Sequence, residues 1–456
     1  MKRVQFLFAL LVGKIIMGLT KIIPGVSGTT WPGGIANILM KNFPKYFKFG
    51  DNTRIVMVTG TSGKTTTTGM LSQLIKSWGK SICTNDIGAN MDRGIATTLI
   101  RHSSMGGKVK ADYIILEVDE RYLPIMTKLI APDVILVTNV LKDQSQRNGE
   151  PGVIMTKLKN AIECGAHLIL NGDEPNSGSL GFGKEKVSYY RVKGEADGYD
   201  ISSNPMAVSC SCPVCGGSIS FEYENLFNIG KYSCSGCDMS SKEDATTISI
   251  DYENNGFDWD GTSFNVKYIS KDFMYCYSSM MEFARHEGVP AEVIQKSIDE
   301  FKIQSGRVEQ MKAGAKTINY LRIKQETPVT LQSAIDVATA DKSEKIVVLD
   351  LSEIVDFNPR YTGMYYAYDC NFRKFMDNNV VKYICMSKTV CYDVATRLYL
   401  EGIAPGDITV IPTDNYDLLL EELEKYDCNT VYLLTWMHSY YSCLSSIEKY
   451  QKKAGE

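Results

Sequence analysis

The chain has 456 residues, of which 44% are hydrophobic and 22% are charged. This length and composition allow large buried cores and predict a globular protein of two or three domains. The formal net charge of −4 excludes a surface that attracts nucleic acid or anionic membranes as a whole, so an anionic ligand must be recognised locally. The 13 cysteines are compatible with a cytoplasmic protein, because four of them have metal-ligand spacing and the others are scattered.

The first 50 residues are expected to form a helical segment, because Val4–Leu19 is apolar apart from Gln5 and Lys14. Lys2 and Arg3 give the basic start of a signal peptide, but no convincing cleavage site follows. Lys14 divides the apolar run, which leaves fewer than the ~20 clean residues that a spanning helix needs. The preferred interpretation is an amphipathic helix that packs on the body of the protein or lies at the membrane surface. A true membrane anchor is the alternative.

Short apolar runs then alternate with longer helical patterns. Strands are expected at 55–59, 113–116, 134–137 and 167–170, and helices at 65–78 and 272–301. This alternation is typical of an α/β fold with a mostly parallel, doubly wound sheet and crossover helices. The tripeptide Ser305-Gly306-Arg307 marks a boundary, so we predict a central domain at residues 51–309. A second series of strands at 345–349, 381–385 and 430–434 predicts a C-terminal α/β domain at residues 310–456.

The segment GTSGKTTT at residues 60–67 follows an expected strand and precedes an expected helix, which is the context of a P-loop. Gly60 and Gly63 let the backbone bend, so that N–H groups and the helix N-terminus face phosphate oxygens. Lys64 supplies a charge to the β and γ phosphates, and Thr65 places its hydroxyl on Mg²⁺. A chance match is the alternative. The residues expected to hold ATP are Gly60, Thr61, Ser62, Gly63, Lys64, Thr65 and Thr66.

A second magnesium ligand is expected at the end of a neighbouring strand. Glu117 stands where the apolar run at 113–116 turns acidic, which suits a carboxylate that contacts Mg²⁺ or its waters. A solvated charge at the strand end is the alternative for Glu117. We expect Asp119 and Glu120 to be solvated charges of that kind.

An inserted module at residues 209–242 is rich in Cys, Gly and Ser. Its two CxxC pairs, Cys212 with Cys215 and Cys234 with Cys237, are separated by 18 residues. Two such pairs complete a closed tetrahedral site of four thiolates, which predicts a structural zinc ribbon. A redox dithiol is the alternative, and Cys210 is too poorly spaced to be a ligand. Few basic residues surround the module, so we expect no nucleic-acid binding.

Several motifs together resemble the Mur ligase central domain: the P-loop, the segment Asn85–Met91, the strand end EVDE at 117–120, and Thr138-Asn139 followed by Asp143, Gln144 and the segment Arg147–Glu150. The inserted ribbon makes the chain similar to the MurT family, the ligase-like subunits of lipid II isoglutaminyl synthase. The similarity is clear over about residues 20–310. It implies a Mur ligase-like P-loop domain with an inserted zinc ribbon and a C-terminal α/β domain.

The resemblance also implies an activity and a partner. In the family, a GatD glutaminase releases ammonia, and the ligase-like subunit uses ATP to turn the α-carboxylate of D-glutamate in the lipid II stem peptide into an acyl phosphate. Ammonia then attacks this intermediate. From the cysteine usage and the N-terminal helix we expect a cytoplasmic protein, located at the inner face of the membrane if that helix lies on the bilayer. Asn139, Asp143, Gln144 and Arg147 would lie near nucleotide and substrate, with a polar turn as the alternative, and Arg307 would reach phosphate from the interdomain hinge.

Two departures from the family are expected to matter. Met274 and Tyr277 stand where the family has asparagines that hold the nucleotide base. Gly363 stands where the family has an aspartate that completes the glutaminase site of the partner. Asp369 is therefore the expected substitute, and Asp356 is the second choice. Both aspartates have an ordinary loop or cap role as the alternative.

These features favour an ATP-dependent amide-forming ligase subunit that acts on a cell-wall muropeptide. Because of the two departures, a nucleotide-binding scaffold or regulatory paralogue is the alternative from another class. An autonomous Mur-type amino-acid ligase is a third hypothesis.

Overall fold

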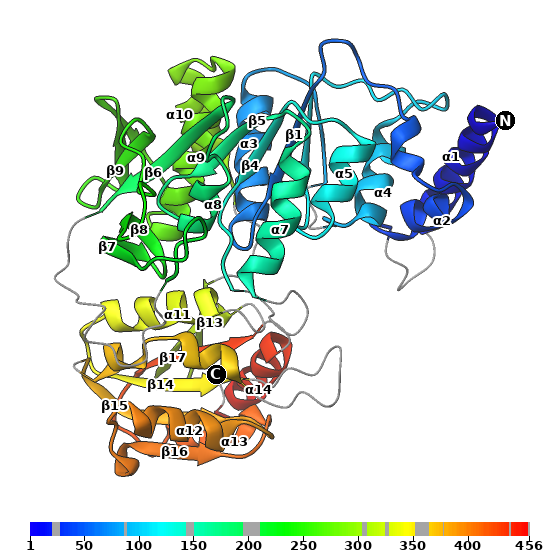
Figure 1. The fold of residues 1–456 in the computed structure, drawn as a ribbon. Helices are drawn as coiled ribbons and strands as arrows, with labels where there is room; N and C mark the ends of the chain where they lie inside the picture. The colour runs from blue at the N-terminus through cyan, green and yellow to red at the C-terminus, as the bar shows by residue number, and fades with distance from the viewer. Residues whose placement is uncertain are drawn as a thin grey trace. The chain divides into compact units, whose positions relative to one another are not determined.

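The computed structural model describes residues 1–20, 28–85, 89–142, 150–194, 210–302, 308–323, 328–351, 364–376, 378–436 and 439–454. The chain divides into two units (Figure 1). The first comprises Met1–Leu141, Glu150–Tyr199 and Ser209–Ile303, and the second comprises Lys142–Gly149, Asp200–Val208 and Gln304–Glu456.

The first unit is built on a sheet whose described part has nine strands in the order β11-β10-β9-β6-β5-β4-β1-β3-β2. Neighbouring strands run parallel from β9, through β6, β5, β4, β1 and β3, to β2. Beyond β9 the sheet continues with β10 and β11, which form an antiparallel hairpin. The parallel strands are β1 (Arg54–Thr59), β2 (Ile82–Thr84), β3 (Tyr113–Glu117), β4 (Val134–Val137), β5 (His167–Asn171), β6 (Val187–Lys193) and β9 (Thr246–Asp251). The hairpin strands are β10 (Gly256–Trp259) and β11 (Thr262–Asn265). All four strands expected here from apolar runs are confirmed.

Helices cover both faces of this sheet, because its central strands are apolar on both sides. Ile55 and Met57 of β1 pack in one core with α4 (Asp92–His102), α5 (Leu123–Leu129) and α7 (Pro151–Ile162). On the other side α3 (Lys64–Ser77) packs against α9 (Lys271–Glu287) and α10 (Ala291–Glu300). The short α8 (Pro175–Ser179) follows β5. The prediction of a doubly wound, mostly parallel sheet is confirmed.

The N-terminal segment forms α1 (Lys2–Leu19), α2 (Trp31–Leu39) and the 3₁₀ turn η1 (Phe43–Tyr46). Helix α1 buries Phe6, Ala9, Leu10 and Gly13 against the rest of the unit. Helix α2 lies very close to α4, since a Cβ on Gly33 would stand 2.1 Å from the carbonyl oxygen of Arg93. Among the described helices, none is long and apolar enough to cross a membrane.

The cysteine-rich module forms the two-stranded antiparallel sheet β7 (Ile219–Leu226) and β8 (Ile229–Cys234). Its small core contains Cys212, Ile219, Tyr232 and Met239. Four residues cannot bury enough apolar surface to stabilise such a module alone, so a cross-link is expected.

The second unit has a described sheet of six strands in the order β12-β13-β17-β14-β15-β16. All neighbours run parallel except the β12–β13 hairpin. The strands are β12 (Val308–Ala313), β13 (Lys316–Ile323), β14 (Lys345–Asp350), β15 (Val380–Met386), β16 (Ile408–Ile411) and β17 (Thr430–Trp436).

Helices also cover both faces of this second sheet, which confirms a C-terminal α/β fold. One core holds α11 (Pro328–Ala340) and α12 (Cys391–Leu400), and the other holds α13 (Tyr416–Leu423) and α14 (Ser439–Ala454). The short turns are η3 (Tyr365–Asp369), η4 (Phe372–Phe375) and η5 (Pro405–Asp407).

Candidate functional site

The P-loop joins β1, an interior strand of the sheet, to α3. Strand β1 lies between β3 and β4, so the loop leaves the sheet at a topological switch point, where α/β proteins bind ligands. Gly60 and Gly63 have φ values of +129° and +82°, which favour glycine. The backbone N–H of Thr67 donates to Gly63, so the N–H groups of the preceding turn lie at the helix N-terminus, the part of a helix that binds anions.

The segment after β4 fixes the shape of the P-loop. The side-chain oxygen of Asn139 accepts the Ser62 backbone N–H at 2.9 Å, and the Thr138 hydroxyl donates to the Ser62 carbonyl at 2.7 Å. The Thr61 hydroxyl accepts the backbone N–H of Leu141 at 2.9 Å. Asn139 therefore contacts the P-loop backbone directly, and its position near the nucleotide loop agrees with the resemblance.

Lys64 is buried and lies beside Glu120, with 3.2 Å between Nζ and the carboxylate. Its ammonium group also donates to the carbonyls of Gly60 and Thr61. Glu120 is itself buried, and Asp119 forms a largely buried ion pair with Arg121 at 2.8 Å. The expectation that Asp119 and Glu120 are solvated is wrong, because the chain turns after Glu117 and brings both carboxylates to cationic partners.

Glu117 ends β3 beside Val58 of β1. Its Oε1 accepts a hydrogen bond from Asn90 at 2.8 Å, and its backbone N–H and carbonyl both bond to the Asn85 side chain at 2.8 Å. Its other oxygen, Oε2, is buried and has no hydrogen-bond partner within the described part of the chain. A buried carboxylate oxygen without a partner is unfavourable unless a cation or donor binds it. Asn85 and Asn90 thus hold a carboxylate with one oxygen available to a ligand.

This arrangement fits ATP and Mg²⁺. The Ser62 hydroxyl is a second buried polar atom that has no partner among the described residues, and it lies in the P-loop itself. The glycine backbone, the helix N-terminus and Lys64 suit phosphate, while Glu117 and the partly buried Thr65 supply oxygen ligands of the kind that Mg²⁺ prefers.

A group that sequence reasoning missed supports this site from β5. The Glu174 carboxylate is fully buried and accepts backbone N–H groups from Val140 and Ser177, both at 2.8 Å. Burial raises its pKa to about 7 against the opposing effect of these N–H donors. The Asn171 side chain donates to the Thr138 carbonyl at 3.0 Å. Glu174 caps α8, and Pro175 at the first helical position is the helix-start signal that the sequence contains.

The base-recognition side of the site differs from the family pattern. Met274 and Tyr277 both lie on α9 and are buried. Tyr277 packs against Phe257 with ring centroids 5.6 Å apart. Cys276 of the same helix lies beside the P-loop, 3.5 Å from where a Cβ on Gly63 would stand. The two substituted positions thus contribute to the core of the unit.

In the second unit, Asp369 lies at the end of η3 and pairs with Lys142, with 3.0 Å between Nζ and the carboxylate. Its carboxylate is therefore already held by a cation. Other sequence-predicted residues lie outside the described residues: Asp143, Gln144, Arg147, Arg307, Asp356 and Gly363.

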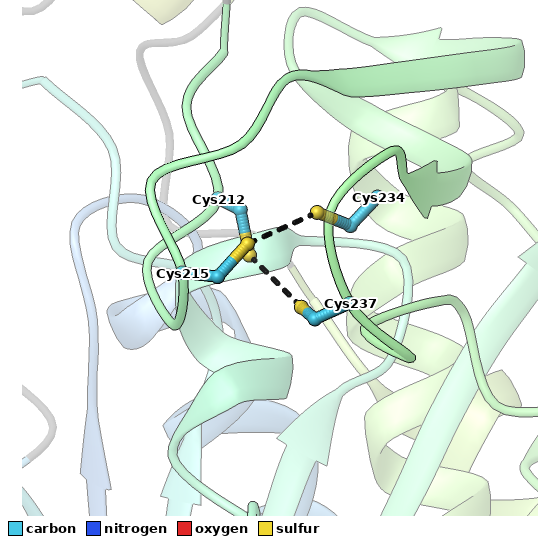
Figure 2. A group of neighbouring side chains, drawn as sticks. All are labelled: Cys212, Cys215, Cys234 and Cys237. Atoms are coloured by element: carbon cyan, nitrogen blue, oxygen red, sulfur yellow. Dashed lines mark hydrogen bonds between the residues drawn. The ribbon is translucent and has the colours of Figure 1, made fainter.

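The four cysteines of the inserted module converge (Figure 2). Their Sγ atoms all lie within 4.8 Å of one another, with 3.7 Å between Cys212 and Cys237 and 3.5 Å between Cys215 and Cys234. Tetrahedral Zn–S bonds of about 2.3 Å place sulfurs roughly 3.8 Å apart, so this spacing fits a zinc ion. Cys210 is not part of this group of metal-ligand candidates among the described residues.

Backbone donors favour the thiolate form at this cluster. The N–H groups of Gly217 and Gly236 donate to the sulfurs of Cys215 and Cys234, both at 3.3 Å. The donation from Gly236 lowers the pKa of Cys234 to about 7, whereas burial and the neighbouring thiols raise the pKa of Cys237 to about 12. The cluster could therefore hold a metal ion through four thiolates, a closed site without an open coordination position.

Purified chain is expected to contain one zinc ion per molecule, and removing the ion should unfold the module, because metal binding and folding are coupled in such sites. Elemental analysis measures the metal. The Cys212→Ser/Cys237→Ser variant should lose it, while the control Cys164→Ser, an exposed cysteine outside the cluster, should keep it. Less than half an equivalent of zinc in untreated wild type, with no other metal present, would contradict the prediction.

The chain matches two protein families. The Mur ligase middle domain family matches residues 58–204, and the MurT ligase C-terminal family matches residues 325–439. The lipid II isoglutaminyl synthase (glutamine-hydrolyzing) subunit MurT of Streptococcus pneumoniae is 28% identical over 426 residues, 89% of each chain. This similarity to a MurT subunit extends over most of the chain. The subunit of the same name from Staphylococcus aureus is 26% identical over 393 residues, 83% of this chain and 84% of the relative.

Solved structures show the same fold. A pseudomurein peptide ligase type C from Methanothermus fervidus has a TM-score of 0.67 at 17% identity, covering 89% of this chain and 80% of its own. MurF ligase from Thermotoga maritima in complex with ADP has a TM-score of 0.57 at 14% identity, covering 92% and 85%. These structures confirm the Mur ligase-like fold, while the MurT relatives and the two family matches confirm the MurT resemblance and indicate an ATP-dependent ligase.

Proposed function

We propose that this MurT-family chain uses ATP to amidate the α-carboxylate of D-glutamate in the lipid II stem peptide, with ammonia from a GatD-like glutaminase. The observation that carries the proposal is that the P-loop with Lys64 follows β1, while Glu117 ends the adjacent strand β3 with one carboxylate oxygen that has no partner among the described residues. Relatives named as lipid II isoglutaminyl synthase subunits support the substrate and the existence of a partner. In this proposal residues 51–309 bind the nucleotide, residues 310–456 face the partner, and the protein works in the cytoplasm.

The chemistry requires activation because a carboxylate is a poor electrophile at neutral pH. A carboxylate oxygen attacks the γ-phosphorus of ATP, ADP leaves, and an acyl phosphate forms. Ammonia then attacks the acyl carbon, inorganic phosphate leaves with the bonding electron pair, and the nitrogen loses a proton to give the amide. Catalysis of phosphoryl transfer consists mainly of positioning and charge stabilisation.

Each residue of the site would have its own role in this reaction. Lys64 would stabilise the transferring phosphoryl group, and Gly60, Gly63 and Thr66 would form the phosphate cradle. Thr65 and Glu117 would hold Mg²⁺, which supplies charge neutralisation when bound. Asn139 would keep the P-loop in its binding shape, while Asp143 and Arg307 would contact nucleotide or substrate.

A nucleotide-binding scaffold is the second candidate function. The burial of Met274 and Tyr277 favours it, because neither side chain presents the amide that holds the base in the family. A scaffold would bind nucleotide through the P-loop without forming an amide.

The experiment that tests the proposal is reconstitution with a co-expressed glutaminase, lipid II, ATP and Mg²⁺. Mass spectrometry of the stem peptide should show isoglutamine, in amounts equal to the ADP released. Ammonium chloride should replace glutamine, because the ligase step needs only ammonia. ATP binding without amide from either nitrogen source would contradict the ligase proposal and favour the scaffold.

We also propose that Asp369 orients the catalytic histidine of the glutaminase, with Asp356 as the second candidate for this role. The third member of such a triad fixes the tautomer and orientation of the histidine, so Asp369→Asn should lower glutaminase activity of the complex at least about tenfold. Asp407→Asn, an exposed carboxylate of the same unit, is the control and should be unchanged. Full activity in both Asp369→Asn and Asp356→Asn would eliminate this role.

A further inference from the structure

The outward surface of α1 is apolar along its whole length. The exposed large side chains of the helix are Val4, Leu7, Phe8, Leu11, Ile15 and Leu19. Their spacing of three and four residues places them on one face of the helix. The residues buried against the rest of the unit, such as Phe6, Leu10 and Gly13, alternate with them and occupy the opposite face. A helix that is apolar on both faces is normally covered on both.

The two polar side chains within the apolar run of α1 are turned toward the protein. Lys14 donates to the carbonyls of Ile100 and Ser103 at 2.8 and 2.7 Å, and Gln5 donates to the Leu39 carbonyl at 3.0 Å. A surface helix usually presents its charges to water and its apolar residues to the core. Here the one lysine within the apolar run is bound inward, so the outward stripe stays free of charge.

Basic residues gather at the N-terminal end of this stripe. Arg3 donates to the carbonyls of Tyr46 and Gly106, which brings two loops to the start of α1. These loops carry the exposed Lys45, Lys48 and Lys108, and a backbone bridge joins the last two. Within the described part of the chain, none of these lysines has an acidic partner.

The charge of this segment contrasts with that of the whole chain. Residues 1–50 contain six lysines, one arginine and no aspartate or glutamate, whereas the complete chain has a formal net charge of −4. The apolar stripe thus belongs to a strongly basic segment of an acidic protein. A bilayer of anionic lipids offers the matching combination, an apolar interior beneath a negatively charged surface.

We propose that the outward face of α1, with the basic residues at its N-terminal end, docks on an anionic lipid bilayer. Figure 1 shows α1 at the edge of the first unit, with α2 on its inner side. The helix would lie in the plane of the interface while its other face stays packed on the protein. The exposed Trp31 at the start of α2 and Met105 in the loop beside Arg3 add side chains that suit such an interface. The proposal stands on these residues alone and does not depend on nucleotide chemistry.

The test is sedimentation of the full chain with vesicles of phosphatidylglycerol and phosphatidylcholine, without nucleotide or lipid II. Wild type should bind these vesicles, bind pure phosphatidylcholine much more weakly, and lose binding as salt rises. The variant Phe8→Gln/Leu11→Gln should bind at least about tenfold more weakly. Lys64→Ala should bind like wild type, so a failure of the proposed ligase activity remains distinct from a failure of docking.

A matched control is available elsewhere on the chain. Phe182 and Leu418 are 58% and 44% exposed, the same fractions as Phe8 and Leu11. Phe182→Gln/Leu418→Gln should therefore keep wild-type binding, and both double variants should unfold at the wild-type temperature. Absence of vesicle binding, equal loss in the control, or equal binding to neutral vesicles would overturn the proposal. A dimer of wild type that Phe8→Gln/Leu11→Gln dissociates would assign this face to a second copy and overturn it as well.

Discussion

Lys64→Ala is expected to lower ATP-dependent turnover by about 10²–10³-fold, because its ammonium group would stabilise the charge that develops on the transferring phosphoryl group. The variant is also expected to lose stability. Lys64 and Glu120 have side chains that are each 10% exposed, so removing the lysine leaves a carboxylate buried without its cation. Removing one partner of a buried ion pair costs about 3 kcal/mol.

A second substitution separates the two losses. The double variant Lys64→Ala/Glu120→Gln leaves no unpaired buried charge. It should therefore regain most of the unfolding free energy that Lys64→Ala loses, while its turnover stays low. Denaturant unfolding and ADP release at saturating ATP and Mg²⁺ measure the two quantities. Lys80→Ala, an exposed lysine just beyond α3, should behave like wild type in both. Wild-type turnover in Lys64→Ala would show that the P-loop is not the catalytic site.

The parts of the site that lie within one local motif could be predicted from sequence. Strand, glycine loop and helix are contiguous in the chain, so Lys64 and Gly63 were placed by the pattern alone. Glu117 could also be placed, because the carboxyl ends of neighbouring parallel strands meet at one edge of the sheet. The four cysteines were predictable because the geometry of thiolate ligation is encoded in their spacing.

Residues whose roles depend on tertiary contacts could not be placed. Nothing in the positions of Asp119 and Glu120 tells that both carboxylates turn toward cationic partners, because the chain leaves β3 after Glu117 and the turn decides their direction. The bond between Asn139 and the Ser62 backbone joins residues 77 apart in the chain. Glu174 was missed for the same reason, although its N-cap position could have drawn attention to it.

Differences in the fold also have physical causes. The helical pattern expected at 272–301 is two helices, because Gly288 ends α9 in a left-handed conformation and Pro290 caps α10. The strands β9 to β11 were missed because they are short and lie in a polar stretch with few apolar alternations. The β12–β13 hairpin was missed because its turn is marked only by Gly314, with φ of +55°.

Gly60→Ala adds only one methyl group, but it is expected to disrupt the P-loop severely. A Cβ at this position would stand 2.2 Å from the Thr138 hydroxyl and 2.8 and 2.9 Å from the Asn139 carbonyl oxygen and backbone nitrogen. The last two atoms are backbone atoms of the segment just after β4, an interior strand, and cannot move aside cheaply. The φ of +129° adds strain, because side chains other than glycine rarely adopt it.

Overpacking costs about 1–3 kcal/mol and a left-handed residue about 1–2 kcal/mol, so Gly60→Ala should lower the unfolding free energy by roughly 2–5 kcal/mol. Gly79→Ala is the matched control, since Gly79 has φ of +78° but no atom within 4 Å of a new Cβ. It should show the backbone strain alone, about 1–2 kcal/mol. Denaturant unfolding measures both, and nucleotide binding should weaken only in Gly60→Ala. Equal destabilisation in the two variants would show that the contact with Thr138 and Asn139 does not constrain the loop.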